Sequence, residues 1–180
     1  NTSKFTAVLL FLTAVVFGQQ KITVENIFGG TFRAKGMDQM QSLKNTNQYT
    51  VLNVDQASRS MQVDLYDFAT LKKVSNLIDT KSFAALADGI DSYTFDASEK
   101  KILIACNSSK IFRHSFTADY FVYDIAGKTL TKLVDSQIQD PTFSPDGTKI
   151  AYAKQNNLYI YDVASKKSTA VTTDGKKNAV

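Results

Sequence analysis

The sequence predicts an all-β fold, organised as about three blades of a β-propeller and preceded by a signal peptide. Three observations predict it: a segment that recurs at a fixed offset, a Tyr-Asp pair that closes three alternating strands, and little helical periodicity. Hydrophobic residues make up 43% of the 180, which is enough apolar material for a core. Four-stranded units that recur about every 40–50 residues are typical of propeller blades.

The recurring segment is a match between residues 143–153 and residues 95–105. Both copies begin with Phe, pass through a polar turn and continue as an apolar strand, with Lys, Ile and Ala at matching positions. In the later copy Pro145-Asp146-Gly147 indicates a tight turn, because proline fixes φ and glycine accepts a positive φ. A β-sandwich with accidentally similar hairpins is the alternative, and the fixed offset favours the propeller.

The Tyr-Asp pairs end alternating strands, and each is followed by a polar turn; they are Tyr66-Asp67, Tyr123-Asp124 and Tyr161-Asp162. We expect a further strand after each turn, over residues 71–74, 129–134 and 168–172. Residues 79–88 are the best helical candidate. Residues 21–180 hold about three to four blades at about 40–45 residues each, whereas propellers close with about four to eight. We therefore expect an incomplete propeller, the N-terminal part of a longer chain.

The N-terminus has the pattern of a secretory signal. Lys4 precedes an apolar run over residues 5–17, followed by Gly18. This predicts a signal peptide over residues 1–20 and an exported protein, periplasmic or secreted. The run is shorter than the roughly 20 residues of a membrane-spanning helix, so we expect no integral span after cleavage. A buried helix or an uncleaved anchor is the alternative. Cys106, the single cysteine, is expected to be a buried or free thiol.

Composition argues against several function classes. The net charge is +4, and no run of Lys or Arg exceeds two, so we predict no nucleic-acid partner. One His and one Cys do not provide a multi-His or Cys-rich metal site. No cofactor and no metal are predicted.

The second repeat is ten residues longer than the third, and its insertion carries the most specific motif. The run from Phe112 to Ala118 reads aromatic-Arg-His-Ser-aromatic-Thr-Ala. It closely resembles the dipeptidyl peptidase IV family of prolyl oligopeptidase-type serine peptidases. The similarity continues through residues 141–147, 156–160 and 171–176.

This resemblance implies an eight-bladed N-terminal propeller, a C-terminal α/β-hydrolase domain and a homodimeric full-length protein. It implies release of Xaa-Pro or Xaa-Ala dipeptides from peptides with a free N-terminus, with the propeller gating and orienting the substrate. Arg113 matches the arginine that donates hydrogen bonds to a substrate carbonyl. The family's pair of adjacent glutamates is missing, since the only two Glu, Glu25 and Glu99, are isolated.

We expect no catalytic residue in this chain. It has no Gly-x-Ser-x-Gly sequence, so the nucleophile elbow of an α/β-hydrolase is not present in it. His114, the single histidine, is interpreted as structural. The chain alone should therefore be inactive. Two alternatives stay open: a non-catalytic exported propeller that binds protein or peptide partners, and another peptidase of the wider group such as an acylaminoacyl peptidase, against which the Arg-His-Ser insertion argues.

Overall fold

A computed structural model describes residues 22–33 and 39–177, which fall into two compact units, one within residues 1–37 and one within 38–180. The first unit contains a short helix, α2 (Val24–Phe28), which begins at Thr23, whose hydroxyl accepts a hydrogen bond from the Asn26 amide at 3.2 Å. The predicted signal peptide over residues 1–20 lies outside the described residues. Among the described residues, none of the helices has the length and apolar composition of a membrane span.

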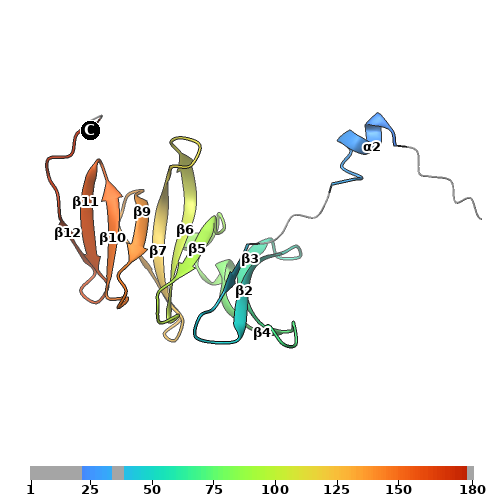
Figure 1. Cartoon of the computed structure of the whole chain (residues 1–180), viewed down its shortest axis with the longest axis horizontal. Coiled ribbons are helices and arrows are strands. Elements are labelled where there is room, and N and C mark those ends of the chain that lie inside the picture. Colours follow the sequence, from blue (N-terminus) through green and yellow to red (C-terminus); the bar gives the residue numbers. More distant parts are fainter. Residues whose placement is uncertain (1–21, 34–38, 178–180) are drawn as a thin grey trace, which may run out of the picture. The chain divides into compact units, whose positions relative to one another are not determined.

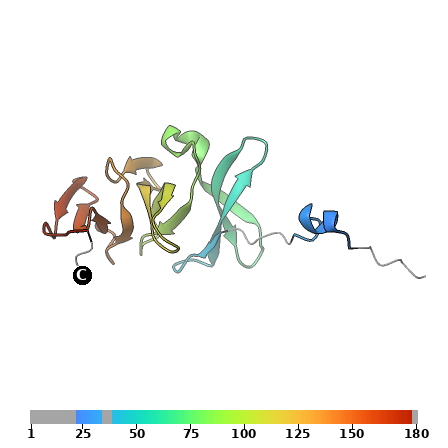
Figure 2. The ribbon, with the colours of Figure 1, turned by 90° about the horizontal axis from the view of Figure 1, so that it is seen from above.

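The second unit confirms the predicted all-β fold. Over residues 39–177 it forms three four-stranded antiparallel sheets, the first, second and third blades, which lie side by side in chain order (Figure 1, Figure 2). The first blade consists of β1 (Met40–Ser42), β2 (Gln48–Asp55), β3 (Ser60–Asp67) and β4 (Lys73–Asp79). The second consists of β5 (Ser92–Phe95), β6 (Lys101–Lys110), β7 (Phe116–Asp124) and β8 (Thr129–Lys132). The third consists of β9 (Gln139–Phe143), β10 (Lys149–Lys154), β11 (Asn157–Asp162) and β12 (Lys167–Ala170).

The two sequence repeats have clear structural counterparts. Phe95 pairs with Ile102 across the first hairpin of the second blade, and Phe143 pairs with Ile150 at the same place in the third. The aspartate of each Tyr-Asp pair ends the third strand of its blade, and its carboxylate accepts a hydrogen bond from the backbone amide three residues further on. The aspartate of each Tyr-Asp pair therefore stabilises the turn that follows it. Its short acidic side chain accepts a hydrogen bond in place of a backbone carbonyl.

Four predicted elements have wrong bounds. The strands expected over residues 129–134 and 168–172 are β8 and β12, which end earlier, at Lys132 and Ala170. The strand expected over residues 71–74 is β4, which begins at Lys73 and extends to Asp79, because Leu71 lies in the turn with a φ of 56°. The helix expected over residues 79–88 consists only of two 3-10 turns, η2 (Thr80–Ser82) and η3 (Ala84–Leu86). Phe83 between them has an extended backbone, with a φ of −138°, so a continuous helix cannot form.

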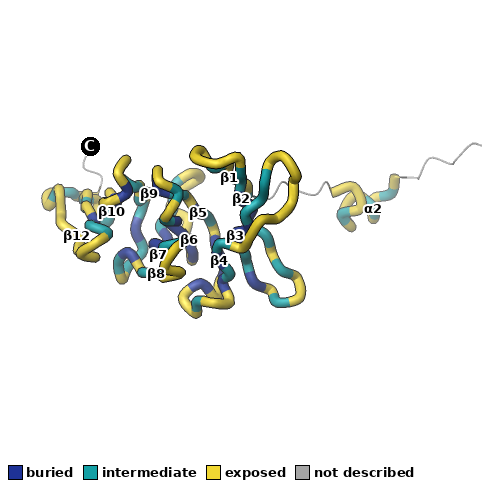
Figure 3. The backbone as a smooth tube through the Cα atoms, turned by 90° about the horizontal axis from the view of Figure 1, so that it is seen from below, coloured by how far each residue is buried: buried dark blue, intermediate teal, exposed yellow. Residues whose placement is uncertain are grey.

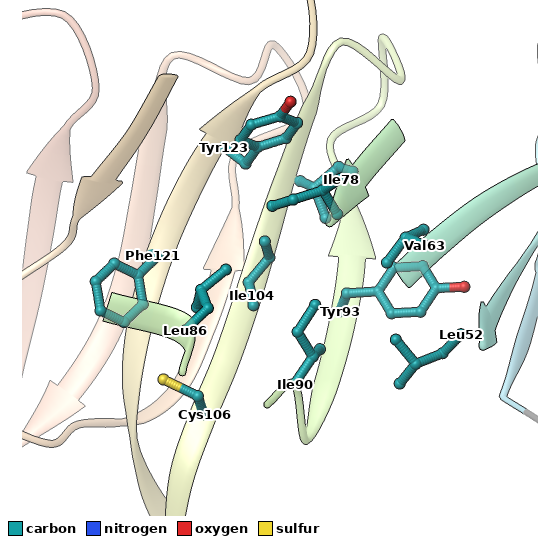
Figure 4. Packing of buried hydrophobic residues seen from close by; sticks show 11 residues of the cluster. Leu52, Val63, Ile78, Leu86, Ile90, Tyr93, Ile104, Cys106, Phe121 and Tyr123 are labelled. Atoms are coloured by element: carbon teal, nitrogen blue, oxygen red, sulfur yellow. The ribbon is translucent and has the colours of Figure 1, made fainter. Parts of the chain in front are cut away.

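The second blade is buried on both faces. The described strands therefore have two hydrophobic clusters, one on each side of this blade. Ile102 and Ile104 of β6 point into a cluster shared with the first blade, and Leu103 and Ala105 into a cluster shared with the third. Strand residues alternate between the two faces of a sheet, so each face of β6 contributes to a different core. Figure 4 shows the first cluster, and Figure 3 shows that buried positions gather along β6 and β7.

Cys106 belongs to the first of these clusters. Its side chain is buried, and it forms no disulfide. Burial is the main factor that raises the pKa of its thiol, to about 11. The expectation of a buried free thiol is confirmed, and this protonated thiol acts as a small apolar core residue.

Candidate functional site

The hairpin between β6 and β7 is longer than its counterpart in the third blade. There, a two-residue turn links Lys154, the last residue of β10, to Asn157, the first of β11. In the second blade Cys106 pairs with Asp119, and twelve residues, 107–118, lie between them. The ten-residue insertion in the sequence is therefore an extension of one hairpin (Figure 1). We call residues 107–118 the Arg113 hairpin.

A β-bulge forms the base of the Arg113 hairpin. Asn107 and Ser108 of β6 together stand opposite Ala118 of β7, because the register shifts between Cys106 and Ser109. Asn107 adopts the left-handed conformation, with a φ of 55°. Bulges bend a strand pair and redirect the side chains beyond them. The hairpin thus leaves the second blade in a direction set at these two residues.

The tip of the hairpin presents Arg113 to solvent. Residues 111–115 form the loop, and the backbone amides of Ile111 and Phe112 both donate to the carbonyl of Ser115, at 2.9 and 3.1 Å. Arg113 and His114 are exposed, and Phe112 is 77% exposed. The loop is held by backbone hydrogen bonds, while its side chains are available to a ligand.

A hollow of about 410 Å³ lies against this hairpin. Its lining comprises Asp91, Ser92, Ser108, Lys110 and residues 112–116. The arginine offers five N–H donors in a planar fork, and Phe112 of the loop and Phe116 of β7 offer apolar surface. A peptide has backbone carbonyls that accept from such a fork and apolar side chains that pack on aromatic rings. The hollow therefore has the chemistry to hold a peptide segment.

The two glutamates of the sequence, Glu25 and Glu99, do not lie in this hairpin. In the part of the chain that the structure describes, no group of three or more His, Cys, Asp or Glu residues is placed to hold a metal ion. Glu99 lies in the β5–β6 turn, where its carboxylate accepts from the backbone amides of Lys44 and Asn45. Glu25 lies in α2 of the first unit. The assignment of His114 as structural stays a prediction.

Sequence reasoning missed two residues that touch the base of the hairpin, Asp91 and Gln137. Asp91 contacts Ser108, and Gln137 contacts Asn107 and Thr117. These partners lie 17 to 30 positions apart along the chain, and no local motif links them. Only the strand register, with its bulge, brings them together.

Three four-stranded blades and one extended hairpin define the described strands as a region of a β-propeller. A family model described as "Dipeptidyl peptidase IV (DPP IV) N-terminal region" matches residues 96–180. The crystal structure of Porphyromonas gingivalis dipeptidyl peptidase 4 has 27% sequence identity and a TM-score of 0.76, over 89% of this chain and 23% of that chain.

Two curated relatives agree with this match. Dipeptidyl aminopeptidase B of Saccharomyces cerevisiae is 33% identical over 129 residues, which cover 70% of this chain and 15% of the relative. Dipeptidyl peptidase 4 of Felis catus is 30% identical over 108 residues, covering 59% of this chain and 14% of the relative. The resemblance is confirmed: the chain is a member of the dipeptidyl peptidase IV family and corresponds to part of its N-terminal propeller region, a small fraction of these relatives' length.

Proposed function

We propose that the chain is the N-terminal propeller region of an exported serine exopeptidase that releases Xaa-Pro or Xaa-Ala dipeptides from peptides with a free N-terminus. Hydrolysis would take place in a C-terminal domain, and the propeller would gate and orient the substrate. The observation that carries the proposal is the extended hairpin with Arg113 at its tip, within a chain whose relatives are named dipeptidyl peptidases. Export is supported by Lys4 and the apolar run over residues 5–17. Homodimerisation stays a prediction.

In this proposal Arg113 binds the backbone of the substrate. A guanidinium stays charged at any physiological pH and presents its donors in a fixed plane, so it can orient a peptide carbonyl. Orientation matters because a nucleophile in another domain must meet the scissile bond at a defined distance. A hydrogen bond to a charged group contributes about 1.5–3 kcal/mol, which corresponds to about a ten- to hundredfold change in kcat/KM.

The test uses the full-length protein and a chromogenic Gly-Pro substrate. Arg113→Ala is expected to lower kcat/KM about ten- to hundredfold, and Arg113→Lys less, because lysine keeps the charge and loses the planar fork. The matched control is Arg59→Ala. Arg59 is an exposed arginine in the corresponding β2–β3 hairpin of the first blade. This control should change kcat/KM by less than about twofold.

Two results would count against the proposal. An unchanged kcat/KM in folded Arg113→Ala protein removes Arg113 from the substrate site. The lack of any hydrolysis of Xaa-Pro and Xaa-Ala substrates by the full-length protein rejects the peptidase itself. The 180-residue chain alone is expected to give no turnover above a buffer blank, and turnover there would place catalysis in the propeller region.

A further inference from the structure

We infer that Asp91 and Gln137 are positioning residues that clamp the base of the Arg113 hairpin from two sides and so determine where Arg113 meets the substrate. This inference rests on the proposed function of Arg113. It adds two residues that lie outside the hairpin, one before the second blade and one after it. Both act through hydrogen bonds with the backbone and the hydroxyl groups of residues 107–118.

The first clamp comes from the segment between η3 and β5. The backbone amide of Asp91 donates to the carbonyl of Ala105 at 2.9 Å, which fixes Asp91 beside β6. Its carboxylate Oδ2 then accepts from the Ser108 amide at 2.8 Å and from the Ser108 hydroxyl at 2.5 Å. Ser108 is a bulge residue without a paired residue of its own on β7. Asp91 thus supplies the acceptor that the regular ladder does not provide there.

The second clamp comes from the segment between β8 and β9. The side-chain amide of Gln137 spans both strands of the hairpin: Nε2 donates to the Asn107 carbonyl at 2.6 Å, and Oε1 accepts from the Thr117 hydroxyl at 2.8 Å. The next residue, Ile138, is held in place, because it exchanges two backbone hydrogen bonds with Ala118, at 3.0 and 3.1 Å. Gln137 is therefore fixed against the bulge from the β7 side.

The hairpin base carries one further set of contacts. The side-chain amide of Asn107 donates to Asp119 Oδ2 at 3.2 Å, and Lys132 Nζ lies 3.1 Å from the other oxygen of that carboxylate. Strand β8 is thereby tied to the same bulge as the two connecting segments. The direction of the hairpin thus depends on side chains from three separate parts of the chain.

The position of Arg113 amplifies any change at this base. Arg113 lies five residues beyond Ser108, at most about 16 Å away at about 3.3 Å per residue. At that length, a rotation of about 4° at the bulge moves the tip by about 1 Å. A displacement of about 1 Å at a substrate-positioning group can lower a rate about a hundredfold. The loss of one hydrogen bond at the base can therefore displace Arg113 enough to lower the rate.

The experiment is a double-mutant cycle in the full-length protein with the chromogenic Gly-Pro substrate. Asp91→Ala and Gln137→Ala are each expected to lower kcat/KM about tenfold, with kcat and KM recorded separately. In an Arg113→Ala background the same changes should lower it further by less than about twofold, because residues that act through one group are not additive. Asp91→Asn, which keeps one acceptor oxygen, should lose less than Asp91→Ala.

The matched control is Asp162→Ala in the third blade. The Asp162 carboxylate also accepts from the amide and the hydroxyl of one serine, Ser165, both at 2.8 Å, far along the chain from the hairpin. We expect kcat/KM of this variant to change by less than about twofold. Amide hydrogen exchange gives a readout that needs no activity. It should accelerate over residues 109–117 in Asp91→Ala and Gln137→Ala, and not in Asp162→Ala.

The outcomes separate this inference from the proposed function. If Arg113→Ala lowers kcat/KM and Asp91→Ala and Gln137→Ala do not, the clamp is rejected and the peptidase proposal stands. A full loss that persists in the Arg113→Ala background means that Asp91 or Gln137 acts independently of Arg113, which also overturns the inference. If the protein does not hydrolyse the substrate, the proposed function fails, and unchanged hydrogen exchange over residues 109–117 would reject the clamp separately.

Discussion

Replacing Asp96 with alanine is expected to lower the free energy of unfolding by about 2–6 kcal/mol. The Asp96 side chain closes the β5–β6 turn and is only 3% exposed. Its Oδ1 accepts from the backbone amides of Lys100 and Lys101 at 2.9 and 2.8 Å, and its Oδ2 accepts from the Ser98 hydroxyl at 2.5 Å. Alanine leaves two backbone donors without their acceptor, each at a cost of about 1–3 kcal/mol. Urea denaturation followed by circular dichroism measures the change.

The pH dependence of this loss has a defined sign. Burial raises the pKa of Asp96, but hydrogen bonds from Ser98, Lys101 and Lys100 outweigh it, so the pKa lies below its ordinary value of 3.8. A carboxyl group whose pKa is depressed by folding stabilises the protein above its unfolded pKa and loses that contribution as pH falls through the folded pKa. The difference between wild type and Asp96→Ala should therefore be full at neutral pH and shrink below about pH 4.

The third blade provides a sharper control for the same turn. At the position equivalent to Asp96 it has Ser144, whose Oγ accepts from the Lys149 amide at 3.0 Å and donates to Asp146 at 2.6 Å. The carboxylate and the hydroxyl are thus exchanged between the two turns. The double variant Asp96→Ser with Ser98→Asp copies this arrangement and should recover more than half of the lost stability. A loss below about 1 kcal/mol for Asp96→Ala, or no recovery in the double variant, would refute this reasoning.

Three further substitutions test the packing of the blades and their turns. Ile104→Ala, at a position with 0% exposure between the first and second blades, should lower the free energy of unfolding by about 2–5 kcal/mol, while Leu158→Ala, at 54% exposure, should cost less than about 1 kcal/mol. Equal losses in urea denaturation would contradict the assigned core. Gly147→Ala should lower the melting temperature, because Gly147 has a φ of 67° and an added Cβ would lie 2.8 Å from Asp96 Oδ2. An unchanged melting temperature would show that this turn is free to shift.

The strand pattern could be predicted from the sequence because its signals are local. The match between residues 95–105 and 143–153 reflects the same pairing next to the turn, Phe95 with Ile102 and Phe143 with Ile150. The start of β4 could not be predicted, because Leu71 takes a positive φ, which is unusual for a branched residue. The two 3-10 turns that replace the expected helix follow from the extended backbone at Phe83, which composition does not indicate.

The candidate site was predictable only in part. The ten-residue insertion predicts a longer hairpin by counting alone, and the structure has that hairpin. Only the family resemblance indicates Arg113, since an exposed arginine in a loop has no distinguishing signal of its own. The bulge at Asn107 and the contacts from Asp91 and Gln137 depend on strand register, which local propensity does not specify.

The second blade packs against a neighbouring blade on each face, and this gives the hairpin a well-packed base. Ile104 and Leu103, neighbours on β6, pack into the cores shared with the first and the third blade. Strands fixed on both faces give a rigid base for a long extension, and the bulge then sets its direction. A substitution such as Ile104→Val or Leu103→Ala, on either face of β6, can therefore tilt the base without touching the hairpin.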